Sequence, residues 1–312
     1  MVFCITLERM LIFFAIFLLG LFLAKKSVIR KEYLGDYAML VTKVFLPVTV
    51  FTMMASSTTA QMIIDNLMLI PLSAAFYAAI TAVLFLLAKL LRVPQDKDRV
   101  FMFSFMFGNT FFVAIPLFTA LFPETGAMYI MVFSIVDQLV FWSFGVWLST
   151  ARDRLGGRKF SLAFVKQVVL SPNIIAMLLS FVFIFIGIKL PGPVLTALNM
   201  VSAPTSALGM IYLGALAGFS NSLSVLKRPE LYVGIVVKMI LLPVLAGKLL
   251  LLTALPTELA TAFVLIMALP VMTVVPMVAT QNGNEGEYAS GILEVTLVAS
   301  VFTMPLVAFL VL

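Results

Sequence analysis

Ten apolar segments, each long enough to cross a lipid bilayer, follow one another along the chain with short polar connections between them. A helix rises 1.5 Å per residue, so roughly 20 apolar residues cross the ~30 Å hydrocarbon core of a membrane. Because lipid cannot satisfy free backbone groups, such segments are expected to fold as helices. The sequence therefore predicts an all-α polytopic membrane protein. The predicted spans cover residues 3–24, 37–56, 67–91, 100–122, 127–150, 169–188, 193–219, 231–253, 257–281 and 287–312.

The composition excludes several other classes of protein. Hydrophobic residues make up 63% of the chain and charged residues only 11%, whereas soluble domains are roughly 45–50% apolar. Histidine is absent and Cys4 is the single cysteine, so metal sites, disulfides and Cys–His nucleophile pairs lack their residues. We expect no catalytic residues, cofactor or metal. A receptor would need an output domain, for which no polar stretch is long enough.

The basic residues divide unevenly between the two sets of connections. The odd-numbered connections carry fifteen Lys and Arg residues, while the opposite side carries Arg9, Lys189 and Lys248. Short cytoplasmic loops collect positive charge, which predicts that the odd connections face the cytoplasm and that both termini lie outside. The polar stretch 281–287 is interpreted as a cytoplasmic connection. The net charge of +6 thus reflects topology, and no nucleic acid partner is expected.

Similar residues recur at similar places in the two halves of the chain. Three pairs are separated by 157, 160 and 157 positions, which suggests a duplicated unit of five spans. Because five is odd, the second copy would be inverted in the membrane. We expect one repeat over residues 1–155 and the other over 156–312. The matched pairs are Pro47 and Pro204, Pro116 and Pro276, and Asp137 and Glu294.

Polar residues and prolines interrupt the fourth and ninth predicted spans. The stretch 108–116 contains Asn109 and ends at Pro116, and the stretch 269–276 contains two prolines. Broken spans are tolerated in lipid where they line a polar cavity, and helix N-terminal ends favour an anion. The alternative is that these prolines merely kink packed helices. The predicted substrate-binding residues are Gly108, Asn109, Thr110, Phe111, Pro116, Thr273 and Pro276.

Four ionisable residues fall inside predicted spans. An unpaired charge at the centre of a span costs about 2.5–3.5 kcal/mol on insertion scales, so we expect Lys238 to contact Asp137 or Glu294, with Gln138 sharing the polar cluster. Such a pair could couple transport to protons or could be a static ion pair. Lys43 is expected to extend its amine to the interface.

Small residues at Gly209, Gly214 and Gly218 fall on the seventh predicted span. Glycines at such spacing let helix backbones approach closely. We expect them to pack helices within the chain, with a subunit interface as the alternative.

Taken together, several motifs resemble those of the auxin efflux carrier family, which includes plant PIN-type auxin carriers and bacterial malate or malonate permeases. The resemblance covers essentially the whole chain. Phe111 stands where the family usually has Gly, Ala114 where a second Gly is common, and Pro172-Asn173 reverses the usual order. The motifs are Phe45-Leu46-Pro47, Gly108-Asn109-Thr110 with Ile115-Pro116-Leu117, Ser171 to Ala176, Leu213-Gly214, Lys238 with Leu242-Pro243, and Ser300 with Thr303-Met304-Pro305.

The resemblance implies two inverted five-span repeats, with a scaffold of spans one, two, six and seven. Broken spans four and nine would cross at the substrate site, where Asn109 and Pro116 match the first crossing and Pro276 the second. Lys238 would be the supporting lysine. The resemblance also implies a homodimer formed through the scaffold and an elevator-like motion. The absence of a long central loop suggests a compact prokaryotic member in the inner, plasma membrane.

The leading hypothesis is a secondary active transporter that moves small organic anions, such as mono- or dicarboxylates, by alternating access. Transport could be coupled to protons or to sodium. It could also be driven by the membrane potential alone, because an anion that leaves a negative-inside cell needs no coupling ion. The alternatives are a sodium-coupled symporter of the bile-acid type or an anion channel.

Overall fold

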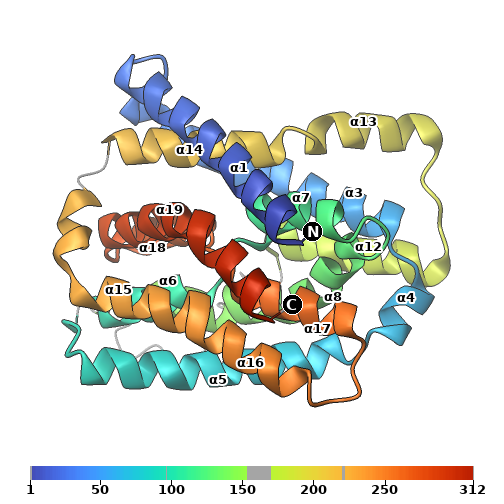
Figure 1. Cartoon of the computed structure of the whole chain (residues 1–312). Helices are drawn as coiled ribbons and strands as arrows, with labels where there is room; N and C mark the ends of the chain where they lie inside the picture. Colours follow the sequence, from blue (N-terminus) through green and yellow to red (C-terminus); the bar gives the residue numbers. More distant parts are fainter. Residues whose placement is uncertain (1, 96, 153–169, 220–221, 312) are drawn as a thin grey trace.

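The structure is a computed structural model that describes residues 2–95, 97–152, 170–219 and 222–311. Within these ranges the regular structure is helical, apart from one isolated β bridge between Gly108 and Val271 (Figure 1). Figure 1 labels the α-helices, and the short 3₁₀ and π turns between them are named η. The chain is therefore an all-helical bundle over its described length.

Helices of the first half run from the N-terminus to residue 149. Several are halves of one predicted span, divided by a turn or a break. They are α1 (Val2–Lys25), η1 (Lys31–Tyr33), α2 (Leu34–Leu40), η2 (Val41–Phe45), α3 (Leu46–Ser57), α4 (Ala60–Asp65), α5 (Leu69–Leu90), α6 (Asp98–Met106), η3 (Thr110–Ala114), α7 (Ile115–Leu121), α8 (Gly126–Val140), η4 (Phe141–Gly145) and α9 (Val146–Ser149).

The helices described in the second half run from Pro172 to Val311. They are α12 (Pro172–Ile186), α13 (Gly192–Ser202), α14 (Thr205–Phe219), η5 (Ser222–Lys227), α15 (Pro229–Val236), η6 (Val237–Leu241), α16 (Leu242–Leu250), α17 (Thr257–Met267), α18 (Val274–Gln281) and α19 (Gly286–Val311).

Seven helical stretches in the described ranges are long and apolar enough to cross a membrane. The predicted fourth, sixth and ninth spans contain shorter apolar helices instead, at Thr110–Leu121, Pro172–Ile186 and Thr257–Met267. Two of these three are the spans whose sequence predicted a break. A multi-pass membrane protein is thus supported, while the full count of ten spans and the inverted relation of the halves stay predictions.

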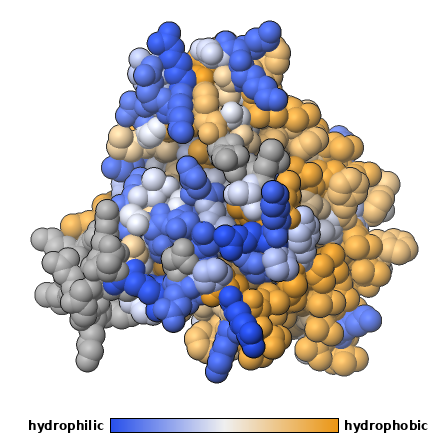
Figure 2. All heavy atoms as spheres, turned by 90° about the vertical axis from the view of Figure 1, so that its left-hand side faces the viewer, coloured by the Kyte–Doolittle hydropathy of each residue, from blue (hydrophilic) through white to orange (hydrophobic). Residues whose placement is uncertain are grey.

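Basic connections gather on one face of the bundle. Gln95, Arg152 and Asn284 come from three different odd-numbered connections, yet they line one cavity. Figure 2 shows hydrophilic side chains crowded over this face, bordered by hydrophobic surface. Helix α1 reaches this face at its C-terminal end and α19 begins there, so both described ends of the chain lie away from it (Figure 1). The grouping of these loops agrees with the charge pattern, and the assignment of this face to the cytoplasm stays a prediction.

Widened π turns precede three of the prolines that the sequence places inside helices. The proline ring has no N–H and clashes with the carbonyl four residues earlier, and one extra residue in the turn moves that carbonyl aside. In η2, for example, the N–H of Leu46 bonds to the carbonyl of Val41, five residues back. The three pairs are η2 with Pro47, η3 with Pro116 and η6 with Pro243.

The predicted packing role of the glycines in α14 is confirmed. A Cβ added at Gly214 would lie 1.9 Å from the carbonyl oxygen of Phe17 in α1, and one at Gly218 would lie 2.8 Å from the Cβ of Ala24. A Cβ at Gly209 would meet the ring of Phe112 at 2.4 Å. The glycines therefore let α14 press against α1 and against η3 within one chain.

Candidate functional site

The break in the fourth predicted span is short and partly closed by its own residues. Helix α6 ends at Met106, and the next helical turn starts at Thr110. The side-chain oxygen of Asn109 accepts a hydrogen bond from the N–H of Phe112 at 3.3 Å, as a helix N-cap does. The Thr110 hydroxyl donates to the carbonyl of Gly108 at 3.1 Å. Asn109 thus begins the second half of this span.

The break in the ninth predicted span is longer and depends on other helices. Helix α17 ends at Met267 and α18 begins at Val274. The carbonyl of Leu269 accepts a hydrogen bond from the Lys238 amine in η6, and the N–H of Val271 donates to the Thr296 hydroxyl of α19 at 3.2 Å. Two side chains from elsewhere in the fold therefore satisfy backbone groups that the break leaves free.

The two breaks meet and pair with each other. The N–H of Asn109 donates to the carbonyl of Pro270 at 2.8 Å, and the N–H of Met272 donates to the carbonyl of Phe107 at 3.1 Å. These bonds form the antiparallel bridge in the middle of the bundle. In addition, the Asn109 amide donates to the Thr273 hydroxyl at 2.8 Å. The structure therefore brings together the polar residues that the sequence singled out in each half.

Close approach at this bridge explains the glycine before Asn109. A Cβ added at Gly108 would lie 3.0 Å from the Cβ of Leu269. That distance is shorter than ordinary van der Waals contact, so the Leu269 side chain would have to move by a few tenths of an ångström. Glycine permits this close approach without such a movement.

A very small cavity, about 10 Å³, lies beside the crossing. A void of this size holds at most about one water molecule. Its walls come from several parts of the fold, because α3 and α12 supply one residue each, α8 and η4 supply three, and the two broken spans supply the rest. The site is closed in this conformation. The lining residues are Leu46, Asn109, Phe111, Phe112, Gln138, Phe141, Trp142, Asn173, Met272 and Val274.

A chain of hydrogen bonds leads from this cavity to a buried carboxylate. Trp142 donates from its indole N–H to Gln138 at 3.0 Å, and the Gln138 amide donates to Asp137 at 3.1 Å. The other oxygen of Asp137 accepts a hydrogen bond from the Tyr77 hydroxyl of α5. Asp137 is fully buried. Two donors thus hold a carboxylate one residue away from the cavity lining.

Lys238 is buried, as expected for an intramembrane lysine with a partner, but the polar partner found is the backbone of the second break. Asp137 takes its hydrogen bonds from Tyr77 and Gln138, which argues against the predicted contact with Lys238. Glu294 is buried on α19, and its pairing with Lys238 stays a prediction. Lys43 is exposed, in agreement with the interface position predicted for it.

Five of the seven predicted binding residues lie outside the cavity lining, and two of the five, Gly108 and Thr273, belong to the bridge itself. The Thr110 hydroxyl turns back to the carbonyl of Gly108, and Pro116 and Pro276 lie in the first turns of α7 and α18. Their position indicates that they shape the helix ends after each break. Phe111, in contrast, lines the cavity directly.

Sequence reasoning missed three residues of this region. Tyr77 gave no signal, because a tyrosine in an apolar span is ordinary and its partner lies 60 positions away. Thr296 was likewise one hydroxyl among many on α19. Asn173 did offer a signal, since it is a polar residue directly after the proline that opens α12, yet it was read only as part of a motif.

Comparison with known proteins identifies the class of the molecule. The chain matches the sequence model of a family described as membrane transport protein over residues 5–155 and 157–308. It is therefore a membrane transporter. The chain belongs to this family, the auxin efflux carriers that its motifs resemble. A search of curated proteins finds no match.

Proposed function

We propose that this chain is a secondary active transporter of small organic anions and that the anion binds at the crossing of the two broken helices. The observation that carries the proposal is the pairing of both breaks around Asn109 and Thr273, whose side chains share a hydrogen bond. The helical segments after the breaks both begin at this point. Helix N-terminal ends carry about half a positive charge each and leave backbone N–H groups free. The Asn109 amide and the two helix N-terminal ends together favour binding of a carboxylate.

The closed cavity supports an alternating-access mechanism. A space of about 10 Å³ cannot hold a carboxylate-bearing molecule, so the walls must separate before a substrate binds. Leu46 and Asn173 belong to the proposed scaffold, formed by spans one, two, six and seven. Asn109, Gln138 and Met272 belong to the proposed transport part. We propose that the second part moves against the first as an elevator, which would open the site to one side at a time.

One contact supports an inverted repeat of ten spans. The hydroxyls of Thr49 in α3 and Thr205 in α14 share a hydrogen bond at 2.7 Å, and the two residues are 156 positions apart. That separation is close to the offset of the matched prolines in the same two spans. Residues related by a two-fold axis touch each other only near that axis, so this contact fits a local axis through the scaffold. We further propose a homodimer in the plasma membrane, formed through the scaffold spans.

Asp137 is the proposed coupling residue. Its carboxylate is buried, and Gln138 links it to the cavity lining. As an ionised group it accepts hydrogen bonds from Tyr77 and Gln138, and protonation would remove part of that accepting capacity. A proton taken up at Asp137 would thereby rearrange Gln138 and Trp142 beside the substrate. Sodium coupling and transport driven by the membrane potential alone are the competing forms of the same activity.

Uptake into proteoliposomes tests the function. Purified protein would be assayed with radiolabelled mono- and dicarboxylates under a proton gradient, a sodium gradient or a potassium diffusion potential. We expect saturable uptake, counterflow of unlabelled substrate and at least a 100-fold loss in Asn109→Ala. Asn199→Ala, on the exposed helix α13, is the matched control and should transport normally. Currents without saturation or counterflow would indicate an anion channel, and normal uptake by Asn109→Ala would exclude the proposed site.

A further inference from the structure

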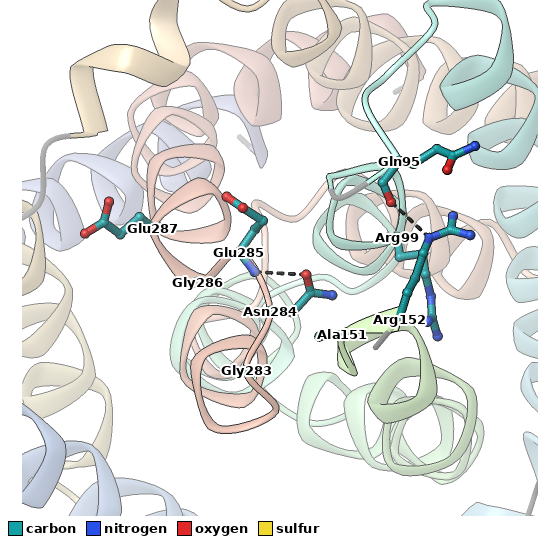
Figure 3. A pocket seen from close by; sticks show the side chains of 9 residues that line it. All are labelled: Gln95, Arg99, Ala151, Arg152, Gly283, Asn284, Glu285, Gly286 and Glu287. Carbon is teal, nitrogen blue, oxygen red and sulfur yellow. Dashed lines mark hydrogen bonds between the residues drawn. The ribbon is translucent and has the colours of Figure 1, made fainter. Parts of the chain in front are cut away.

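Two cavities at the basic face share a pair of arginines. The first, about 560 Å³, is polar and lies between the connections of this face (Figure 3). The second, about 720 Å³, is a mainly apolar groove between α5, α6 and the η4–α9 segment. Arg99 and Arg152 line both, and Figure 3 shows the two side chains beside each other on one wall of the polar cavity. The arginines therefore separate a polar compartment from an apolar one.

Arg99 is a buried cation whose hydrogen bonds are incomplete. It is only 7% exposed. Its guanidinium lies over the Trp147 ring at 4.2 Å and donates to the carbonyl of Trp147. Its Nε is buried and has no hydrogen-bond partner among the described residues. A buried donor without a partner costs about 1–3 kcal/mol, so Arg99 is not fully satisfied by the described residues, although it lines both cavities.

The nearest carboxylate does not neutralise the pair. Asp98 accepts from Arg152 at 2.6 Å through one oxygen and from the backbone N–H of Arg99 at 2.7 Å through the other. Among the residues that line the groove, two guanidinium groups thus face one carboxylate, which gives this end of the groove a net positive charge. An anionic group of the ligand would balance it.

The groove opens on the surface that faces lipid. Phe85 on its wall is 61% exposed, and Ala78 and Ala82 on the same helix are also exposed. Helix α5 lies at the edge of the bundle (Figure 1) and has Lys89 in its last turn. The apolar wall runs along the membrane span, and the arginines lie at the end of that span. The apolar wall matches the acyl chain of a lipid, and the arginines at its end match the charged headgroup.

We propose that the groove binds an anionic phospholipid of the leaflet at the basic face, with its phosphate at Arg99 and Arg152 and an acyl chain along Phe85, Met102 and Phe144. Basic pockets between membrane helices bind anionic headgroups, and each basic residue near the surface contributes about a fivefold gain in affinity.

The polar cavity is less suited to a free soluble anion. Glu285 and Glu287 line it together with the arginines, and Glu285 lies 3.7 Å from Lys97 in an ion pair. These carboxylates would repel a second anion that enters from water. The groove side of the arginines has an apolar wall instead, which favours an anion carried on a hydrocarbon chain.

Quenching of tryptophan fluorescence tests the proposal directly. The chain has two tryptophans, so Trp142→Phe leaves Trp147, which lines the groove, as the single reporter. The protein in mixed micelles would be titrated with phosphatidylglycerol or phosphatidylcholine that carries bromine on its acyl chains. We expect phosphatidylglycerol to quench Trp147 at a concentration at least fivefold lower than phosphatidylcholine.

Variants in the same background separate the two parts of the site. Arg152→Gln, whose side chain is 53% exposed, should bring the preference for phosphatidylglycerol close to one. Ala82→Phe should fill the groove and weaken quenching by both lipids. Lys31→Gln, an exposed residue outside the groove, is the control and should keep the preference. Size-exclusion profiles would verify that each variant is folded.

Three results would overturn the proposal. The first is equal quenching by both lipids in the parent protein. The second is an unchanged preference in Arg152→Gln. The third is displacement of brominated phosphatidylglycerol by equimolar glycerol 3-phosphate, which would show that a soluble anion alone accounts for binding.

Discussion

The two helix breaks at the crossing differ in how they are held open. The first extends over Phe107 to Asn109 and is capped by the side chain of its own Asn109. The second extends over residues 268–273, and Lys238 and Thr296 from two other helices satisfy its backbone groups. The first break is therefore defined locally and the second by tertiary contacts. This difference implies that substitutions far from the second break in sequence should damage the site most.

Lys238→Met should have the largest effect on the second break. The change removes the amine donor and leaves the carbonyl of Leu269 without this partner. A buried group that loses its hydrogen-bond partner costs about 1–3 kcal/mol, so we expect substrate affinity to fall roughly 5- to 150-fold. Initial uptake rates over a range of substrate concentrations would measure it. Lys248→Met, an exposed lysine of α16, is the control. Equal affinities in the two variants would show that the second break does not need Lys238.

Thr296→Val should weaken the same break to a smaller extent. Valine keeps the shape but removes the acceptor for the N–H of Val271, which corresponds to about 1–2 kcal/mol and about a five- to thirtyfold loss of affinity. Thr303→Val is a matched control on α19, because the Thr303 hydroxyl is buried and has no hydrogen-bond partner in the part of the chain that the structure describes. The double variant with Lys238→Met should lose less than the sum of the two effects, since both support one segment.

Phe111→Gly tests the first break, because it should change which substrates fit beside Asn109. Phe111 lines the small cavity, and the motif resemblance predicts that it stands where this family usually has glycine. Its removal should enlarge the space beside Asn109 and shift the preference towards longer carboxylates by about tenfold, as pocket size typically does. Competition between substrates of increasing chain length measures the shift. An unchanged order of preference would mean that Phe111 does not set the size limit.

Gly108→Ala should have the smallest effect of the four. Its Cβ would lie 3.0 Å from the Cβ of Leu269, but the neighbouring atoms belong mainly to a side chain, which can move by a few tenths of an ångström. Overpacking of this kind costs about 1 kcal/mol at its lower limit. We expect about a fivefold loss of uptake and a slightly lower unfolding temperature. A complete loss would indicate that the bridge itself cannot adjust.

Part of this architecture could be predicted from sequence, because it rests on local chemistry. The apolar segments imply helices, and Pro116 and Pro276 mark interrupted spans that are indeed broken in the structure. The partners of the buried charges could not be predicted in the same way. Charge balance predicts an acidic partner for Lys238, but nothing in the sequence indicates that its amine donates a hydrogen bond to the carbonyl of Leu269. A free backbone group has no signature in sequence, and the contact between Tyr77 and Asp137 depends on how α5 packs on α8.

The groove at the basic face escaped prediction for a related reason. Arg99 is one of the fifteen basic residues of the odd-numbered connections, which predict the topology. Nothing in the sequence indicates that its role differs from that of its basic neighbours. Its burial and its position over Trp147 arise only when α6 packs against α9. Basic residues of a membrane protein can thus indicate its topology or form a binding site. Only the topology can be predicted from their positions along the sequence.

The central claim, that substrate binds at the crossing when the closed cavity opens, can be tested by thiol accessibility. Cys4 is the single cysteine of the chain, so Cys4→Ser gives a background for Val274→Cys in the cavity lining and for Val28→Cys, an exposed control. The measurement is the rate of labelling by a charged thiol reagent in membranes, with and without a transported carboxylate. We predict that substrate slows labelling at position 274 at least tenfold and leaves position 28 unchanged. Equal labelling rates at position 274 with and without substrate would contradict the account.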